Sequence, residues 1–262
     1  MSIKKSYLEY LQVIRTSLLR IVILVVIIII LNMTLSINIY NLHGYKIPFL
    51  YPDPLNNIAI QVITTMKQNL LSDNITLIQV APGQAFFAQI HMAGLLGVMF
   101  ATPLIIREFI VFIGPGLYRH EKAIIKKIFI PAIMLFTIGC AFSYFIVIPH
   151  MIAFLYQYGE SIGVVTFFDI SKFITFVMQF LIIFGFSYQL PLIMWAITIS
   201  EIVRPTFWRK NMRYIIVILV VFGAVITPDG SGITMWFIAG PMILMYVIGF
   251  IIIEKKSKNK IQ

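Results

Sequence analysis

Six long runs of apolar residues, separated by polar segments, organise this sequence. The runs cover Leu19 to Ile39, Ala85 to Ile113, Ile128 to about Ile148, Phe173 to Ile199, Tyr214 to Ile226 and Ile233 to Ile253. A helix of about 20 apolar residues crosses a hydrocarbon layer of about 30 Å. The pattern therefore predicts an all-α integral membrane protein with six transmembrane helices.

The last two predicted spans are short or interrupted. The fifth run is long enough for only about 20 Å of helix, and Gly240-Pro241 interrupts the sixth. We expect this part of the molecule to thin the bilayer or to be covered by another helix. At the end of the second run, Arg107 and Glu108 are expected at the membrane interface.

Two polar segments flank the first run. In residues 1–18 apolar positions recur every three or four residues beside basic ones, which predicts an amphipathic helix on the membrane surface. Residues 40–84 are rich in proline and asparagine, with modest apolar stretches. We expect them to form a long outer-side loop with short amphipathic helices.

Composition agrees with a membrane location. The 262 residues are 60% hydrophobic and only 11% charged, and the mean hydropathy is +0.95. This is too little polar material to cover a soluble globule. We expect one six-span domain over residues 1–262.

The basic residues predict the orientation. Of the 20 Lys and Arg residues, all but Lys46, Lys67 and Lys172 fall on the side that holds both termini in a six-span arrangement. The positive-inside rule then places the termini and the loops at residues 114–127 and 200–213 on the cytoplasmic side or its organellar equivalent. The net charge of +10 is distributed over span ends and not gathered on one soluble face, which argues against nucleic-acid binding.

No catalytic or metal-binding pattern occurs in the sequence. The four histidines lie in different segments, Cys140 is the single cysteine, and there is neither a paired-carboxylate spacing nor a glycine-rich phosphate loop. We expect no enzyme activity, no metal and no cofactor. The polar residues inside the apolar runs are instead the functional candidates.

Three motifs follow one another along the chain. The first loop reads F-x-x-P-x-L-x-x-x-E from Phe112 to Glu121, span four carries Gln189 before Pro191, and Thr227-Pro228-Asp229 follows the short span five. Together they resemble the motifs of the TatC family, the polytopic subunit of the twin-arginine protein translocase. The resemblance covers nearly the whole chain. It implies a receptor and core subunit that binds twin-arginine signal peptides and moves folded proteins with the proton-motive force.

The resemblance places signal-peptide binding at the first cytoplasmic loop and the N-terminal segment. The candidate residues are Glu9, Arg15, Phe112, Pro115, Leu117, Tyr118, His120 and Glu121. A guanidinium pairs with a carboxylate through two parallel hydrogen bonds, which lysine cannot form, so Glu121 suits an arginine pair. The alternative is that Glu121 forms an ordinary surface ion pair with Arg119, Lys122 or Lys126.

The N-terminal segment departs from the family pattern H-L-x-E-L-R-x-R-L. Alignment on Leu11, Arg15 and Leu18 leaves Val13 where the carboxylate belongs and Ser17 where the second arginine belongs. Glu9 lies one helical turn before position 13 and could replace that carboxylate. Alternatively, Glu9 pairs with Lys5.

The resemblance also implies single-span partners of the TatA and TatB kind. The candidates for docking a partner helix are Gln189, Pro191, Thr227 and Asp229. Gln189 could bond a polar residue of a partner or pair internally, and Asp229 could simply cap span six. We further expect a homo-oligomer.

Isoleucine-rich spans and a Lys/Asn-rich tail suggest an A+T-rich genome. They favour the mitochondrial inner membrane, with a bacterial plasma membrane or a plastid thylakoid as alternatives. Two other functions stay open, a structural subunit of a respiratory complex and a small-solute secondary transporter. No internal repeat supports the transporter.

Overall fold

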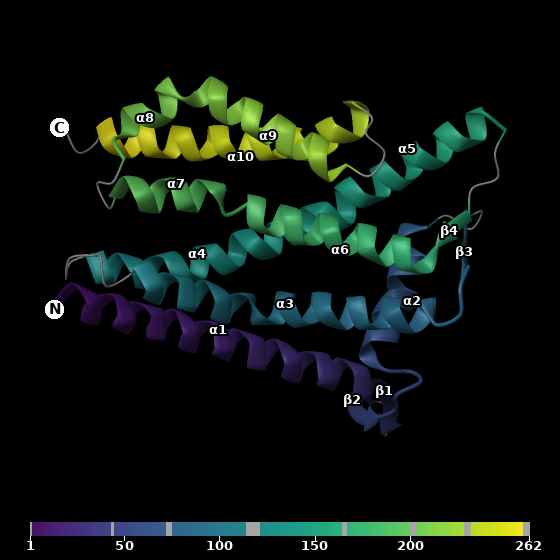
Figure 1. Ribbon diagram of the computed structural model, residues 1–262. Coiled ribbons are helices and arrows are strands. Elements are labelled where there is room, and N and C mark those ends of the chain that lie inside the picture. Colours follow the sequence, from purple (N-terminus) through teal and green to yellow (C-terminus); the bar gives the residue numbers. More distant parts are fainter. Residues whose placement is uncertain are drawn as a thin grey trace. The chain divides into compact units, whose positions relative to one another are not determined.

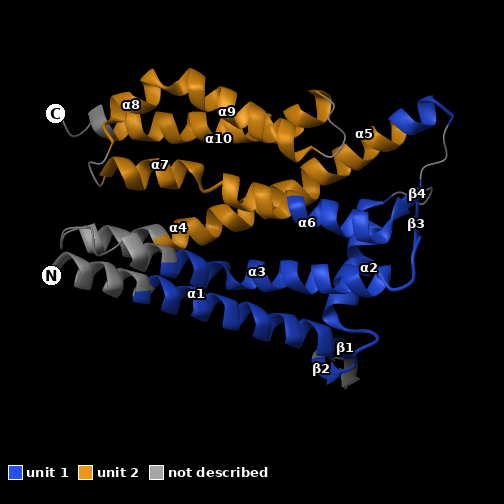
Figure 2. Cartoon of the chain, viewed as in Figure 1, with its two compact units in different colours: residues 1–115, 158–179 blue, residues 116–157, 180–262 orange. Residues whose placement is uncertain are grey.

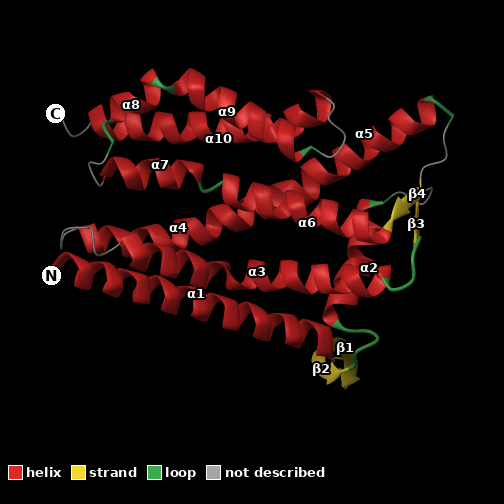
Figure 3. Ribbon diagram, in the orientation of Figure 1, coloured by secondary structure: helices red, strands yellow, loops and turns green. Residues whose placement is uncertain are grey.

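The computed structural model describes residues 2–42, 45–71, 75–113, 121–163, 167–199, 203–227 and 232–258. Helices dominate them, and the strands are short (Figure 3). In chain order (Figure 1) the elements are α1 Ser2–Thr34, β1 Leu35–Leu42, β2 Tyr45–Pro52, α2 Ile58–Leu70, β3 Thr76–Ile78, α3 Gln84–Ile113, α4 Glu121–Phe142, the π-helical turn η2 Ser143–Val147, α5 Ile148–Ser161, β4 Phe167–Asp169, α6 Ile170–Ser187, α7 Leu190–Ile199, α8 Pro205–Lys210, α9 Met212–Ile226 and α10 Gly232–Lys258. The prediction of a mainly helical chain is confirmed.

Within the described residues, five helical segments are long and apolar enough to cross a membrane. They are Ile14–Thr34, Gln84–Glu108, Phe129–Ser161, Ile170–Ile199 and Gly232–Lys256. These segments correspond to predicted spans one to four and six. The fifth predicted span is α9, an apolar helix of 15 residues, which is short as expected.

The first span ends earlier than predicted. Helix α1 stops at Thr34 and not at Ile39, because β1 and β2 form an antiparallel hairpin that starts with the pair Leu35 and Pro52. From Leu35 to Ile39 apolar and polar residues alternate, which is the strand period, although their mean hydropathy resembles that of a span. At its other end α1 has no break, so residues 2–18 continue directly into the span.

The segment at residues 40–84 contains the hairpin strand β2, helix α2 and strand β3. A short amphipathic helix was predicted there, and α2 buries one stripe formed by Ala59, Ile63, Met66 and Leu70. The hairpin was not predicted. Asn57 caps α2 by accepting from the Ile60 N–H, and its Nδ2 donates to the Met33 carbonyl at the end of α1.

The third span continues past the predicted stop at Pro149. The Ile148 N–H donates to the Ser143 carbonyl, which is the five-residue spacing of a π turn, and the helix resumes as α5 up to Ser161. A π turn carries one more residue than an α turn. Pro149, which has no N–H to donate, directly follows this π turn, so the altered hydrogen-bond spacing accommodates it within a continuous helical segment.

The sixth span is neither short nor interrupted, so that prediction was wrong. Helix α10 has 27 residues and passes through Gly240-Pro241 without a break. A proline removes one backbone hydrogen bond, and transmembrane helices tolerate it where their neighbours satisfy the freed group. The short span is therefore α9 alone.

Contacts divide the chain into two compact units, residues 1–115 with 158–179 and residues 116–157 with 180–262 (Figure 2). In the first unit α1 packs along α3. A Cβ atom on Gly97 would lie 3.2 Å from both Val25 and Ile29, so the glycine permits this close approach. The parallel strand pair β3–β4 ties the start of α3 to the start of α6, and the Ser171 hydroxyl donates to the Gln84 carbonyl.

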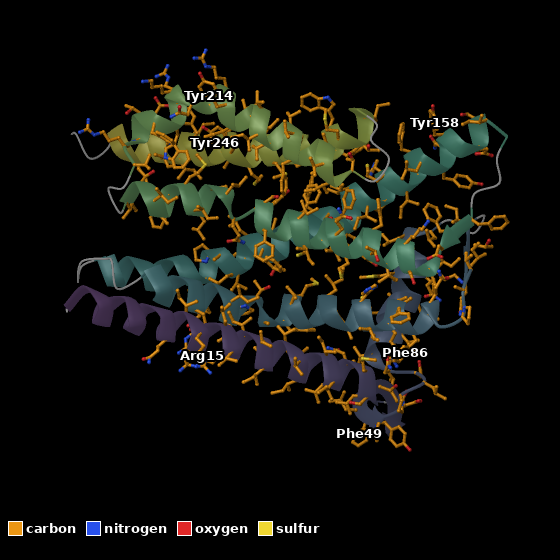
Figure 4. All side chains as sticks on the ribbon, in the orientation of Figure 1. Arg15, Phe49, Phe86, Tyr158, Tyr214 and Tyr246 are labelled. Carbon is orange, nitrogen blue, oxygen red and sulfur yellow. The ribbon has the colours of Figure 1, made fainter. Side chains whose placement is uncertain are left out.

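In the second unit α10 packs against both α7 and α9. Polar groups fix the connection at α8. The Tyr246 hydroxyl (labelled in Figure 4) donates to the Trp208 carbonyl at 2.7 Å, and the Trp208 indole donates to Thr198 Oγ1 at 2.9 Å. These bonds join α10, α8 and α7.

Candidate functional site

The predicted signal-peptide loop lies between α3 and α4. Helix α3 ends at Ile113, one residue after Phe112, and α4 begins at Glu121. The side chains of Phe112 and Glu121 and all of residues 114–120, with Pro115, Leu117, Tyr118 and His120, lie outside the described residues. The loop therefore joins the ends of two long helices, and the roles of its side chains remain predictions.

The N-terminal candidates Glu9 and Arg15 both belong to α1. The Glu9 side chain lies outside the described residues, whereas Arg15 is exposed. Figure 4 shows Arg15 on the side of α1 turned away from α3. That position leaves its guanidinium accessible to solvent or lipid headgroups.

A buried carboxylate that the sequence did not single out lies near the end of α3. Glu108 is 3% exposed, Ser17 Oγ donates to its Oε2 at 2.6 Å, and Arg20 Nη1 lies 3.5 Å from its Oε1. Ser17 and Arg20 are three residues apart on α1 and so share one face of that helix. The three residues, called here the Glu108 cluster, link α1 to α3.

The sequence carried a partial signal for this cluster. Glu108 is an acidic residue at the edge of an apolar run, and such a residue needs a partner. Sequence alone could not identify that partner, because Ser17 lies 91 residues away in the chain. It also gave no reason to separate buried Glu108 from exposed Arg107.

Gln189 and Pro191 lie where predicted span four breaks into α6 and α7. Pro191 has no N–H, so the helix cannot continue its hydrogen-bond ladder, and Tyr188 and Gln189 form a turn. Gln189 is 9% exposed, and its Nε2 donates to the Ala132 carbonyl of α4 at 3.0 Å. The structure thus shows the internal pairing that the sequence left open.

Pro191 is buried against α10. A Cβ atom on Gly249 would lie 2.8 Å from Pro191 Cα, so α10 approaches this turn as closely as a glycine allows. Gln189 and Pro191 are buried, whereas their neighbours Phe186 and Ile193 are exposed. A partner helix that docks here would therefore contact Phe186 and Ile193 before it reached Gln189 or Pro191.

Thr227 is the buried C-cap of α9, with its Oγ1 donating to the Ala224 carbonyl at 3.0 Å. Asp229 lies outside the described residues, and so does its suggested capping of span six. Among the described residues, no group of three or more His, Cys, Asp or Glu could hold a metal ion.

Comparisons with known proteins address the family. Residues 9–241 match the sequence model for TatC, the Sec-independent protein translocase protein. The TatC protein of Cenarchaeum symbiosum (strain A) is 43% identical over 252 residues, which cover 96% of each chain. The TatC protein of Aquifex aeolicus (strain VF5) is 30% identical over 209 residues, which cover 78% of this chain and 86% of that protein.

A solved structure shares the fold. The crystal structure of a twin arginine translocase receptor, TatC, matches with a TM-score of 0.77 and 25% sequence identity, and the match covers 95% of this chain and 99% of that one. The order of the three motifs, the helical architecture and these matches agree over nearly the full length. The chain belongs to the TatC family of Sec-independent protein translocase proteins.

Proposed function

We propose that this chain is the receptor and core subunit of a twin-arginine protein translocase, which binds twin-arginine signal peptides and moves folded proteins across a membrane. The observation that carries the proposal is the match to TatC over residues 9–241, together with the fold shared with a twin-arginine translocase receptor. The residues of the first-loop motif, Phe112, Pro115, Leu117 and Glu121, are all present.

Recognition is assigned to the loop between α3 and α4 and to the start of α1. Glu121 supplies a carboxylate for one guanidinium of the signal peptide. Phe112, Pro115, Leu117, Tyr118 and His120 shape the surface around it, and Glu9 and Arg15 contribute from α1.

Photocrosslinking tests this assignment directly. A photoreactive residue at position 122 in native membranes leaves the Glu121 carboxylate in place, so it should crosslink to a peptide with two adjacent arginines and much less to the same peptide with two lysines. With the same probe, Glu121→Ala should weaken peptide binding by about 1.5 to 3 kcal/mol, the range of charge-assisted hydrogen bonds. Glu160→Ala, which removes an exposed carboxylate of α5, is the matched control. Unchanged crosslinking and export in Glu121→Ala would reduce Glu121 to a surface ion pair.

The proposed topology has six spans with both termini on the cytoplasmic side or its equivalent. It counts α9 as a span in addition to the five long segments. The basic residues at the span ends support the orientation.

Single-span partners of the TatA or TatB kind are proposed to assemble along α7, α9 and α10. Exposed apolar side chains on these helices could face either lipid or a partner helix. They include Ile193, Val217, Ile218, Val221, Trp236 and Leu244. In this proposal Gln189, Pro191 and Thr227 contribute by holding the helix ends behind that surface, and Asp229, which lies outside the described residues, is a further candidate for docking a partner.

The proton-motive force is proposed as the energy source, and several copies of the chain as the working assembly. The membrane is proposed to be the mitochondrial inner membrane, with a bacterial plasma membrane or a plastid thylakoid as alternatives. The relatives include a chloroplastic TatC of Pisum sativum at 29% identity as well as the Cenarchaeum symbiosum protein at 43%. Fractionation of the source cells, with antibodies against this chain, decides among the three.

A further inference from the structure

The Glu108 cluster has a geometry that an ordinary structural ion pair between α1 and α3 does not require. The Glu108 carboxylate is 3% exposed, yet its cationic partner Arg20 is 60% exposed. The contact between them is one nitrogen to one oxygen at 3.5 Å, whereas a guanidinium in its favoured geometry makes two shorter parallel bonds to a carboxylate. Arg20 therefore contacts the carboxylate loosely, and most of its own side chain stays exposed on the surface of the protein.

Ser17 holds the other carboxylate oxygen firmly. Its hydroxyl donates to Oε2 at 2.6 Å, a distance typical of a hydrogen bond to a charged acceptor. The carboxylate is thus oriented by one partner and only loosely neutralised by the other. An ionised carboxylate has about four acceptor sites, so Oε1 can accept from an incoming guanidinium.

The cluster also lies where the N-terminal segment departs from the family pattern. Position 13, where a carboxylate is expected, lies one helical turn before Ser17 and two turns before Arg20 along one face of α1. The chain has Val13 there and Ser17 in place of the second arginine. Glu108 brings a carboxylate to this face from the neighbouring helix, and the small Ser17 side chain leaves room for it.

The cluster is also placed at the boundary of the apolar segments. Glu108 is the last residue of the apolar segment of α3, and the apolar segment of α1 begins at Ile14, three residues before Ser17. A carboxylate at such a boundary has a strong requirement for a cation, because it lies at the edge of the hydrocarbon layer. An arginine that reaches the membrane surface can meet that requirement.

We propose that Glu108 is a guanidinium-binding residue of the signal-peptide site and that Arg20 is an internal occupant displaced by an arginine of the signal peptide. The proposal rests on the proposed receptor function. It assigns to Glu108 the role that a carboxylate at position 13 would have. Arg20 lowers the apparent affinity of the empty site, because binding must first release it.

The decisive variant is Arg20→Gln in the full-length chain, reconstituted in lipid nanodiscs. The probe is a fluorescent synthetic signal peptide with two adjacent arginines, and its binding is followed by anisotropy. Removal of the internal occupant should tighten binding several-fold. A purely structural ion pair predicts the opposite, namely weaker or unchanged binding together with a lower melting temperature.

Two further variants complete the test. Glu108→Gln should weaken peptide binding about tenfold or more, the loss expected for one charge-assisted bond, and should reduce the preference for an arginine pair over a lysine pair. The double variant, with both Arg20→Gln and Glu108→Gln, should bind the peptide as weakly as Glu108→Gln alone, because Arg20 acts only through the Glu108 carboxylate. Arg107→Gln, at the exposed neighbouring position of α3, removes the same charge as Arg20→Gln and should leave binding unchanged.

The outcomes separate this inference from the receptor function. If the unmodified chain binds the twin-arginine peptide but Arg20→Gln does not tighten that binding, Glu108 is a structural residue and the receptor proposal stands. If the unmodified chain binds the peptide with two arginines no better than the peptide with two lysines, both proposals fail. Should Glu108→Gln fail to fold, the Arg20→Gln result decides alone, because its expected sign is opposite to that of a lost structural contact.

Discussion

At the scale of single residues, several described polar groups within the apolar helices bond to the backbone of their own helix. Thr102, Thr137 and Thr198 each donate to the carbonyl four residues earlier. Such bonds satisfy the hydroxyl without a second helix. Gln189 differs, because its amide crosses from the α6–α7 turn to the Ala132 carbonyl of α4.

This difference leads to a prediction for Gln189. Replacement by leucine keeps the volume similar but removes the donor to Ala132, so it should lower the stability of the isolated chain in detergent. The expected loss is about 0.6 kcal/mol and at most about 2, the range for hydrogen bonds between membrane helices. Thermal unfolding followed by tryptophan fluorescence measures it.

The control for Gln189→Leu is Ile193→Leu, an isomeric change at an exposed position one turn further along α7. It should leave the melting temperature unchanged. If Gln189→Leu is as stable as the unmodified chain but loses transport, the amide acts on a partner helix and not on Ala132.

Sequence could predict which polar residues matter but not what they contact. Gln189 stood out because an amide inside an apolar run is costly. Its partner is a backbone carbonyl 57 residues away, which carries no side-chain signature. Glu108 did not stand out, because its burial depends on how α1 packs on α3. The residues of the first-loop motif could be identified only through the family.

At the scale of elements, helix positions were predictable and their ends were not. Hydropathy located the long helical segments because about 20 apolar residues form a strong local pattern. It failed at Leu35, where the chain turns into a strand without becoming polar. It also failed at Pro149 and Pro241, because a π turn or neighbouring helices can accommodate a proline that would end an isolated helix.

The start of α6 gives a prediction about pH. The backbone N–H of Lys172 donates to Asp169 Oδ1 at 3.0 Å, and this bond lowers the pKa of the Asp169 carboxyl below its ordinary value. A lowered folded-state pKa contributes stability that is fully present above the unfolded value of about 3.9. The contribution is lost as the pH falls through the lower folded-state pKa.

Asp169→Asn should therefore make the stability of the folded chain depend less on pH in the acidic range. Asparagine caps a helix as well as aspartate does but does not titrate in this range. The melting temperature of the variant should fall less than that of the unmodified chain between about pH 6 and about pH 3. Parallel curves for the two proteins would show that the Asp169 carboxylate does not couple to folding.

At the scale of the whole molecule, a topology map tests the six-span arrangement. Single cysteines would be placed in a Cys140→Ala background. Labelling should place positions 5, 122, 210 and 258 on one side of the membrane, and positions 53, 160 and 229 on the other, because the basic residues fix the orientation. Buried Cys140 is the single native cysteine, so its replacement removes the background signal. Positions 122 and 210 on opposite sides would contradict the six-span arrangement.

The short helix α9 connects this arrangement to transport. Its 15 residues span about 22 Å, against a hydrocarbon layer of about 30 Å, whereas the 27 residues of α10 beside it span about 40 Å. A span shorter than the hydrocarbon layer is accommodated by local thinning of the bilayer, by snorkelling of flanking side chains or by association with other helices, and we expect thinning here. A thinner layer lowers the barrier for a large polar cargo.

Insertion of four leucines after Val221 tests whether this shortness is used. The longer α9 would match the hydrocarbon layer, since it would span about 28 Å. Transport should then fall while signal-peptide binding persists, because the proposed binding residues lie on α1, on α3, in the loop before α4 and at the first residue of α4, Glu121. The control is an insertion of four serines at the same position. It displaces Gly223 from its contact with Ala239 by the same helical turn as the leucines do, but it adds little apolar length. Transport should therefore fall less with serines than with leucines. Equal transport by the leucine variant and the unmodified chain, with the variant correctly inserted, would mean that bilayer thinning at α9 plays no part in moving the cargo.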